Sequence, residues 1–550
     1  MTTIAGLASG SGRTLLHLAD RRPGGAALGV VVTDDPDAAI LGRAADRGVE
    51  TVVVERAARM EAAEYDRRLL QALAEYDVDL VGLDGFDTEP SATFLEEAPL
   101  TIDAHSSLLP AFPVSQPVRA ALEAGVSVTG STVHLVRASS ASVRADQNGD
   151  IPPILTQEAV PVYADDDHAS LQERVRTQAK QKAYSRAVRL LAEGRVTVTD
   201  AAGQADVSNE GDDGGHADVS IEGDHGGRFP ARRMLSEDRG RALRYGENPH
   251  QEAALYVDAT ATEASVVHAD QLNPGAKALS YNNYNDGAAA LDLIAEFSAP
   301  AAAVIKHTNP AGCAVADSLA DAYDRALATD EKSAFGGVVS LNRPCDRATA
   351  ERVVETFKEA VVAPGYSAAA LAVLRQEDDL RVLDVGEIDP RAGGLVEKPI
   401  AGGRLVQDRD VTAPDPEELE VVTEREPTAA ERETMAFAWR TIKHVKSNAI
   451  VFAAGTETVG IGMGQVSRVD AVSLAAMKAE NDAEGKNAEG AVMASDAFFP
   501  FRDGIDEAAT AGIEAVVQPG GSVNDDAVIE AADEHGMAMA FTGTRAFRHD

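Results

Sequence analysis

Short runs of branched apolar residues alternate with amphipathic segments through the first 195 residues of this 550-residue chain. Three such runs are ALGVVVT (27–33), ETVVVE (50–55) and VDLVGL (78–83), and each is followed by a segment whose apolar residues have helical spacing. Val-rich strands separated by helices are typical of a parallel sheet covered by helices. The pattern therefore predicts a doubly wound α/β domain over residues 1–195.

An acidic, glycine-rich segment follows and nearly repeats itself. ADVSNEGDDGGH (205–216) and ADVSIEGDHGGR (217–228) are identical at nine of twelve positions. The segment has no aromatic and few apolar residues, so it cannot build a core, and we expect a flexible linker over residues 196–228. A calcium-binding acidic repeat is the alternative interpretation.

Residues 229–550 form a second region in which strands and Ala-rich helices are expected to alternate. Expected strands include AAAVIKH (301–307), GGVVSLN (336–342), NAIVFAA (448–454) and AVMASD (491–496). A less regular acidic stretch, Glu377 to Thr428, is expected to separate this region into two halves.

The charge balance excludes some classes of partner. The chain has 89 Asp and Glu against 50 Lys and Arg, a net charge of −39, and only 11 of the basic residues are Lys, the first being Lys180. Nucleic acids and anionic membranes are bound through clustered positive charge, so neither is an expected partner. An acidic, Lys-poor surface suits concentrated salt, where screening acts over about 3 Å at 1 M, and we expect a halophilic protein.

Two cysteines, Cys313 and Cys345, provide neither a disulfide framework nor a zinc quartet, so no metal is expected. No apolar run reaches the roughly 18 residues of a membrane span, and the N-terminus lacks a basic leader region. We therefore expect a soluble, cytoplasmic protein.

Two motifs in the first domain are candidate binding and catalytic elements. SGSGRT lies where the first strand turns into the first helix, and its backbone N–H groups can cradle a phosphate; the residues are Gly10, Ser11, Gly12, Arg13 and Thr14. DAHSSLLPAFP (103–113) places His105 at a strand end, where ligands bind in doubly wound sheets.

With these motifs, and with DLVGLDGF, GSTVHLV and GDIPPILTQ in the same order, residues 1–195 resemble the glycinamide ribonucleotide formyltransferase family. The resemblance implies formyl transfer from 10-formyltetrahydrofolate, a co-substrate, to an amine. It implies that His105 stabilises the oxyanion of the tetrahedral intermediate, that Asp150 keeps this His protonated, and that Phe86 lies at the folate site. Asp103 stands where the family has a catalytic Asn.

Several residues depart from the family pattern. Asp103 cannot donate a hydrogen bond to an oxyanion unless it is protonated, and Asp87 and Thr88 replace a folate-contacting Met-Arg pair. Val114 replaces a Gly on the substrate side, and about nine extra residues precede Asp150. An active formyltransferase and a catalytically degenerate domain are therefore both open interpretations.

In the second region, basic residues occur next to apolar strands. Lys306 and His307 end an apolar run in IKHTNPAG, and KHVKSN (443–448) repeats the pair. Further cations lie in LRYGENPHQ (243–251) and at Arg468 in GIGMGQVSR. Cations from distant segments can converge on a phosphate and a carboxylated ligand.

These motifs, followed in order by SDAFFPFRD and TRAFRH, make residues 229–550 similar to the aminoimidazolecarboxamide ribonucleotide (AICAR) formyltransferase domain of bifunctional purine-synthesis enzymes. The resemblance implies two cytidine-deaminase-like α/β units, without the deaminase zinc signature. It also implies a homodimer, since family members build the site across a dimer interface.

The same resemblance implies roles for individual residues. His307 is the expected base, Lys306 stabilises the developing charge or protonates the leaving folate nitrogen, and Asn448 positions the reactants. Asp503 is expected to face the folate. The expected substrate contacts are Arg244, Tyr245, Gly336, Glu359, Arg468, Phe498 and Arg545.

The sequence thus predicts a fusion of the two formyl-transferring steps of de novo purine synthesis, without the cyclohydrolase module that usually accompanies the second domain. One alternative is an AICAR formyltransferase with an inactive N-terminal domain. Another is a non-enzymatic protein that binds folate or nucleotide.

Overall fold

The computed structural model describes residues 1–57, 59–88, 90–136, 152–199, 218–221, 229, 233, 235, 237–258, 260–391 and 393–549. The chain divides into two compact units, Met1–Met234 and Leu235–Asp550, here called the N-terminal and C-terminal units. Within these described residues, no helix is both long and apolar enough to cross a membrane.

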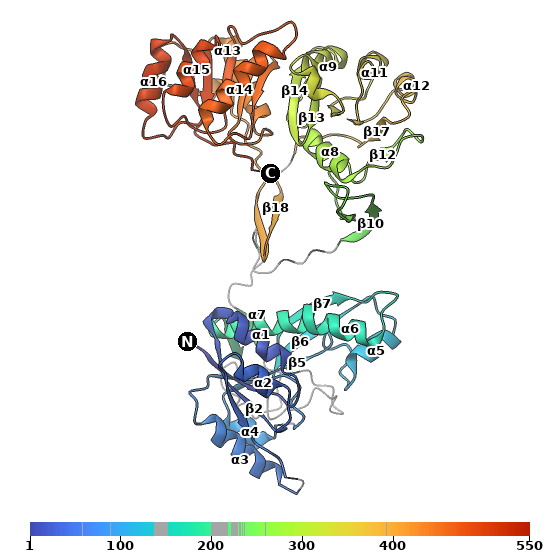
Figure 1. Cartoon of the computed structure of the whole chain (residues 1–550), viewed down its shortest axis with the longest axis vertical. Coiled ribbons are helices and arrows are strands. Elements are labelled where there is room, and N and C mark those ends of the chain that lie inside the picture. Colours follow the sequence, from blue (N-terminus) through green and yellow to red (C-terminus); the bar gives the residue numbers. More distant parts are fainter. Residues whose placement is uncertain are drawn as a thin grey trace. The chain divides into compact units, whose positions relative to one another are not determined.

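The N-terminal unit is built on a seven-stranded sheet (Figure 1). The strands, in sheet order, are β3 (Glu50–Val53), β2 (Ala27–Thr33), β1 (Thr3–Leu7), β4 (Leu80–Leu83), β5 (Leu100–His105), β6 (Val128–Leu135) and β7 (Ile154–Pro161). The first five are parallel to one another, and β6 pairs antiparallel with both β5 and β7. The predicted doubly wound α/β fold is confirmed: two of the Val-rich runs are the buried inner strands β2 and β4, and the third is the partly exposed edge strand β3.

Helices connect the strands and cover the sheet. They are α1 (Arg13–Arg21), η1 (Pro23–Gly25), α2 (Ile40–Ala45), α3 (Ala62–Leu73), α4 (Ala92–Glu97), α5 (Pro117–Glu123), α6 (His168–Arg174), η3 (Val175–Lys180) and α7 (Gln181–Ala192). The last three follow one another without interruption, and η3 is a π-helical turn. A capping box at Asp167 and Ser170 starts this long helix.

The predicted linker differs from expectation at its two ends. Strand β8 (Val196–Thr199) pairs antiparallel with β9 (Asp218–Ile221), with Val198 opposite Val219. Val219, from the second copy of the acidic repeat, packs against the core of the N-terminal unit. The segment DVSI of β9 alternates polar and apolar residues, which suits a strand. The residues between β8 and β9 lie outside the described part of the chain.

The C-terminal unit contains a twelve-stranded sheet. In sheet order its strands are β12 (Asp270–Gln271), β17 (Arg381–Asp384), β16 (Ala360–Ala363), β15 (Val338–Leu341), β13 (Ala301–Lys306), β14 (Asn309–Val315), β22 (Glu457–Gly462), β21 (Ile450–Ala454), β23 (Val492–Ser495), β24 (Ala515–Gln518), β25 (Ala538–Phe541) and β20 (Glu420–Val421). Two small hairpins, β10 (Asp238–Leu243) with β11 (Ala253–Val257) and β18 (Leu395–Ile400) with β19 (Gly403–Asp408), complete the unit.

The helices of this unit repeat in two sets (Figure 1). The first half carries α8 (Tyr281–Ile294), α9 (Leu319–Leu327), α10 (Glu331–Ala334), α11 (Arg347–Val353) and α12 (Ala368–Leu374). The second half carries η4 (Pro416–Glu418), α13 (Ala429–Ile442), α14 (Arg468–Asn481), α15 (Asp503–Thr510) and α16 (Asp525–Glu534).

Each half has the same order of elements: a helix, a β-hairpin, and three parallel strands separated by helices. The predicted pair of α/β units is confirmed, but the stretch expected to separate them, Glu377 to Thr428, includes β17 of the first half and β20 of the second, so the connection lies between these two strands. Backbone pairing between the halves is antiparallel, with Ala314 of β14 opposite Glu457 of β22.

This antiparallel junction brings different ends of the two halves together. Lys306 ends β13 beside the start of β15, where Ile305 faces Val338. Ile450 starts β21 opposite both Gly462 and Ser495, the last residues of β22 and β23. The starts of parallel strands in one half and the ends in the other thus meet at one end of the sheet.

Candidate functional site

The turn that joins β13 to β14 carries the predicted base. His307 and Thr308 both have positive φ angles, 52° and 64°, which is unusual for residues with side chains. The Thr308 N–H donates to the Asp286 carboxylate at 2.7 Å, and the Asn309 amide donates to the His307 carbonyl at 3.1 Å. These bonds hold the turn, so the His307 imidazole projects from a fixed backbone.

A cavity of about 500 Å³ lies on one side of this turn. It brings together six residues that the sequence predicted for one site: Arg244, Tyr245, Lys306, His307, Gly336 and Glu359. Gly336 has φ 69°, and a Cβ there would lie 3.7 Å from the Lys306 Nζ, which donates to the Phe335 carbonyl. That distance is an ordinary contact, so it is the positive φ that favours glycine at this position.

The charges in this cavity are only partly neutralised. Glu359 pairs with Arg381 at 2.6 Å and Lys277 pairs with Asp379 at 3.1 Å. Arg244 and Lys306 also line the cavity, and in the described part of the chain neither has a carboxylate partner. The cavity thus offers two cations to an anionic ligand.

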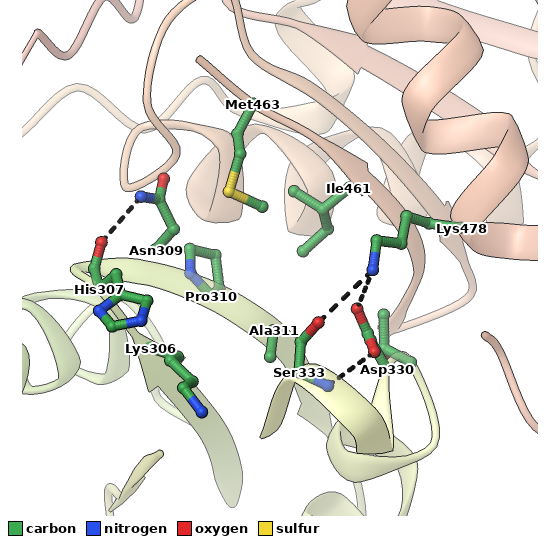
Figure 2. Close-up of a pocket in the computed structure, with 11 residues that line it drawn as sticks. Lys306, His307, Asn309, Pro310, Ala311, Asp330, Ser333, Ile461, Met463 and Lys478 are labelled. Carbon is green, nitrogen blue, oxygen red and sulfur yellow. Dashed lines mark hydrogen bonds and ion pairs between the residues drawn. The ribbon is translucent and has the colours of Figure 1, made fainter. Parts of the chain in front are cut away.

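A second cavity of about 310 Å³ lies between the halves and shares Lys306 and His307 with the first (Figure 2). Pro310, Ile461 and Met463 give it an apolar wall. At its other end Lys478, from α14, binds the Asp330 carboxylate at 2.7 Å. This cavity suits a flat apolar group with a polar end.

Two other predicted residues of this unit, Arg468 and Asn448, lie in a hydrogen-bonded group with the buried carboxylate of Asp496. Arg468, 8% exposed, donates to Asp496 at 2.6 Å and to the Asn448 Oδ1 at 2.8 Å. Arg468 therefore orients Asn448 and is not open to a ligand in this structure. The Lys446 backbone N–H donates to the Asn309 Oδ1 at 2.9 Å, which links the segment before Asn448 to the turn that carries His307.

Like Asn448 and Arg468, three further predicted residues lie outside both cavities. Phe498 follows Asp496 by two residues and is half-exposed. Arg545 lies over the ring of Phe547, 4.9 Å from its centre, and Asp503 begins α15. Their predicted ligand contacts stay predictions.

The basic pair in KHVKSN, Lys443 and His444, binds a carboxylate away from the two cavities. Lys443 Nζ and His444 Nε2 lie 2.9 Å and 3.1 Å from the two carboxylate oxygens of Glu296, at the end of α8. All three side chains are largely buried. The pair ties one half of the unit to the other and lies outside both cavities.

In the N-terminal unit, SGSGRT forms the turn from β1 into α1. Gly12 has φ 50°, and a Cβ there would lie 1.9 Å from Ile40, so only glycine fits. The Thr14 N–H donates to the Asp84 carboxylate at 2.8 Å. One backbone donor of the predicted phosphate cradle is therefore already bonded.

The loop after β5 is held by β6. His105 donates from Nε2 to the Phe112 carbonyl at 3.0 Å, and Ser131 donates to the His105 carbonyl at 2.9 Å. Burial lowers the pKa of His105, although the Phe112 carbonyl and the Asp103 carboxylate favour its charged form. The bond to the Phe112 carbonyl thus holds the ring at the end of β5 through Nε2 and does not involve Nδ1.

Behind His105 lies a cluster of buried charges. Lys180 pairs with Asp84 at 2.8 Å, and their side chains are only 14% and 10% exposed. Burial opposes the charge of Lys180, but the carboxylates of Asp84 and Asp103 outweigh it and raise its pKa. The Tyr184 hydroxyl closes the cluster by donating to the Leu83 carbonyl at 3.0 Å.

The predicted folate side of this unit is occupied by its own polar contacts. Phe86 packs against the core under α3 and α4. The Asp87 N–H donates to the Ser9 hydroxyl at 2.7 Å, and the Thr88 hydroxyl donates to the Asp34 carboxylate at 2.8 Å. Asp150 lies outside the described residues.

Comparison with known proteins identifies both regions. Residues 169–478, more than half of the chain, match the family described as AICARFT/IMPCHase bienzyme. The chain belongs to the AICARFT/IMPCHase bienzyme family. Residues 2–188 match the formyl transferase family, so this bienzyme-family chain is a fusion, as the sequence predicted.

Solved structures similar to this AICARFT/IMPCHase-family chain cover its N-terminal part. Glycinamide ribonucleotide transformylase 1 from Symbiobacterium toebii is 34% identical over 40% of this chain and 94% of its own, with a TM-score of 0.34. Phosphoribosylglycinamide formyltransferase from Anaplasma phagocytophilum is 26% identical over 41% and 96%, with a TM-score of 0.32. The enzyme from Streptococcus pneumoniae is 29% identical over 35% and 99%, with a TM-score of 0.30.

Some site residues of this family member were not predicted from its sequence. Asp286, which accepts the Thr308 N–H of the turn between β13 and β14, ends the segment LSYNNYND (279–286) and had no predicted role. Arg381 and Asp330 line the two cavities without belonging to a recognised motif. In the N-terminal unit, Lys180 and Arg176 come from η3, and only the scarcity of lysine could have drawn attention to the first.

Proposed function

We propose that the C-terminal unit transfers the formyl group of 10-formyltetrahydrofolate to the amine of AICAR. The observation that carries this proposal is that Lys306 and His307 line both cavities. A nucleotide in the larger cavity and a folate in the smaller one would meet at these two side chains. Two substrates held at one pair of catalytic groups is the arrangement that a transfer reaction requires.

The cavity charges support this assignment of ligands. Arg244 and Lys306 offer cationic donors to a phosphate, and Glu359 offers acceptors to ribose hydroxyls. The apolar wall formed by Pro310, Ile461 and Met463 suits the flat ring system of a folate.

The reaction forms one C–N bond and breaks another. The AICAR amine attacks the formyl carbon, His307 takes a proton from the amine, and the bond from this carbon to folate N10 breaks. N10 takes up a proton, with Lys306 as its donor or as the cation that stabilises the oxyanion. The products are formyl-AICAR and tetrahydrofolate.

We further propose that the N-terminal unit formylates glycinamide ribonucleotide. The His105 Nε2–H is bonded to the Phe112 carbonyl and Ser131 donates to the His105 backbone carbonyl, so in the protonated ring the Nδ1–H is the donor left for an oxyanion. Arg13 and Arg176 lie near the SGSGRT turn and supply positive charge for a phosphate; burial and the charge of Arg13 lower the pKa of Arg176.

The alternatives remain an AICAR formyltransferase with an inactive N-terminal unit and a non-enzymatic folate or nucleotide binder. We propose no cyclohydrolase activity, although the family name includes one, because the residues before 169 match a formyl transferase instead. We also propose a homodimer. The rings of Phe335 and Phe357 contact each other at a tilt of 49° beside the larger cavity and are 56% and 45% exposed, which suits a covered surface.

The test follows tetrahydrofolate release by the full chain in multimolar salt, with either ribonucleotide. His307→Ala is expected to abolish turnover of AICAR only, and His105→Ala turnover of glycinamide ribonucleotide only. His268→Ala, outside both sites, is the matched control. Full AICAR turnover by the first variant would refute the C-terminal assignment, and full glycinamide turnover by the second would refute the N-terminal one.

A further inference from the structure

Strand β5 of the N-terminal unit carries a carboxylate where an oxyanion site needs a hydrogen-bond donor. Asp103 lies on β5 two residues before His105, and its Oδ1 accepts only the N–H of Ala104, at 2.7 Å, among the described residues. An ionised carboxylate repels a developing oxyanion, since like charges in a partly buried site are weakly screened. A working site therefore needs a compensating cation.

A second carboxylate increases this requirement. Asp84 follows β4, the neighbour of β5 in the sheet, and is 10% exposed. Burial alone would raise the pKa of Asp84, but Lys180 and the Thr14 N–H outweigh burial and lower it. Two negative groups thus lie at adjacent strand ends.

Lys180 provides a positive charge near both carboxylates. Its ammonium lies 2.8 Å from the Asp84 Oδ1, and the charges of Asp103 and His105 are close enough to interact with it. An ammonium has three N–H donors, and among the described residues only Asp84 accepts one. Two donors remain at the end of the sheet where the catalytic loop begins.

The π-helical turn explains how this side chain reaches the site. Lys180 ends η3, and beyond it α7 resumes with the apolar face Ala183, Tyr184, Ala187 and Val188 against the sheet. Lys182, two residues later, is exposed. A π turn adds a residue to the helix and re-aims the side chains before it, and such turns are frequent at functional sites.

We propose that Lys180 is a positioning residue of the N-terminal formyl-transfer site, where its ammonium offsets part of the negative charge of Asp103 and Asp84 and so allows an oxyanion to form beside His105. The inference rests on the proposed glycinamide ribonucleotide activity of this unit. In this proposal Asp103 and Lys180 together stabilise the oxyanion, as an uncharged hydrogen-bond donor at position 103 would do alone.

The test is a double-mutant cycle in the full chain, with turnover of glycinamide ribonucleotide and of AICAR measured on the same preparations. Lys180→Met is expected to lower glycinamide turnover at least tenfold with AICAR turnover unchanged. In an Asp103→Asn background the same substitution is expected to cost less than a third of that factor, because the carboxylate at the oxyanion position is gone and only Asp84 remains. Lys180→Arg should restore most of the activity, and the exposed control Lys182→Met should change neither activity.

The outcomes separate the inference from the function on which it rests. An equal loss in both backgrounds, or no loss, overturns the role of Lys180 and leaves the activity standing. A wild-type protein inactive on glycinamide ribonucleotide, with an active Asp103→Asn variant, shows that Lys180 does not compensate Asp103. Inactivity of both refutes the proposed function of the unit and the inference together. Thermal unfolding of each variant identifies a loss caused by misfolding, which the arginine variant does not share.

Discussion

Glu296 is the residue whose removal gives the sharpest test of how the two halves of the C-terminal unit are joined. Its carboxylate binds Lys443 at 2.9 Å and His444 at 3.1 Å. The Lys443 side chain is 4% exposed, and its only other acceptor among the described residues is the Thr412 carbonyl at 2.8 Å. Glu296→Ala therefore leaves a buried ammonium without a counter-charge.

Removing one partner of a buried ion pair costs about 3–5 kcal/mol. At roughly 2 °C per kcal/mol for a large domain, the unfolding midpoint should fall by about 6–10 °C. The assay is scanning calorimetry of the full chain in low salt and in about 1 M salt, since a buried pair is only weakly screened. Glu351→Ala is the matched control, because Glu351 pairs with Arg347 at 2.7 Å with both side chains at least half exposed, and such pairs contribute less than about 1 kcal/mol.

Acid provides a second readout of the same contact. Burial alone would raise the pKa of Glu296, but the hydrogen bond from His444 and the charge of Lys443 lower it below the ordinary 4.5. Its contribution to stability is therefore present above pH 4.5 and is lost as pH falls through the lower folded-state pKa. The difference between wild type and Glu296→Ala should shrink in that range. A midpoint shift no larger than that of the surface control, or one independent of acid, would refute the reasoning.

Three further predictions test other parts of the chain. Asp286→Ala should leave the Thr308 N–H without its acceptor and lower AICAR turnover about tenfold or more, because a displaced catalytic turn misplaces its imidazole, while the KM for AICAR changes little; turnover within twofold of wild type would contradict this. Burial raises the pKa of both Cys313 and Cys345 to about 12, so an aromatic disulfide reagent at pH 8 should label neither thiol in native protein and both after denaturation. Burial alone would raise the pKa of Asp84, but the charge of Lys180 outweighs burial and lowers it, so the N-terminal unit should lose stability as pH falls below 3.8. The measurement is acid unfolding of the wild type and of an Asp84→Asn variant, which should lack this dependence.

The features that the sequence predicted well depend on local pattern. Val-rich runs between helices predicted the parallel core of the N-terminal sheet, and the run ending at Lys306 and His307 predicted a strand with both residues at its end. In each case neighbouring residues determine the element, so apolar periodicity is enough to find it.

The features that it did not predict depend on contacts distant in the chain. Arg468 was expected to bind substrate, which stays a prediction, and its ion pair with Asp496, 28 residues away, was not predicted. Glu296 captures Lys443 across 147 positions, and no local pattern indicates such a partner. The π turn ending at Lys180 depends on a single additional residue in a long helix, which periodicity over a short window does not reveal.

The repeat within the C-terminal unit has a consequence for binding stoichiometry. The hairpin turn of the first half carries His307 and Thr308, whereas the equivalent turn of the second half, between β21 and β22, consists of Gly455 and Thr456. The antiparallel junction places these turns at opposite ends of the sheet. Duplication of the architecture has therefore not duplicated the chemistry, and calorimetric titration should saturate at one AICAR molecule per chain.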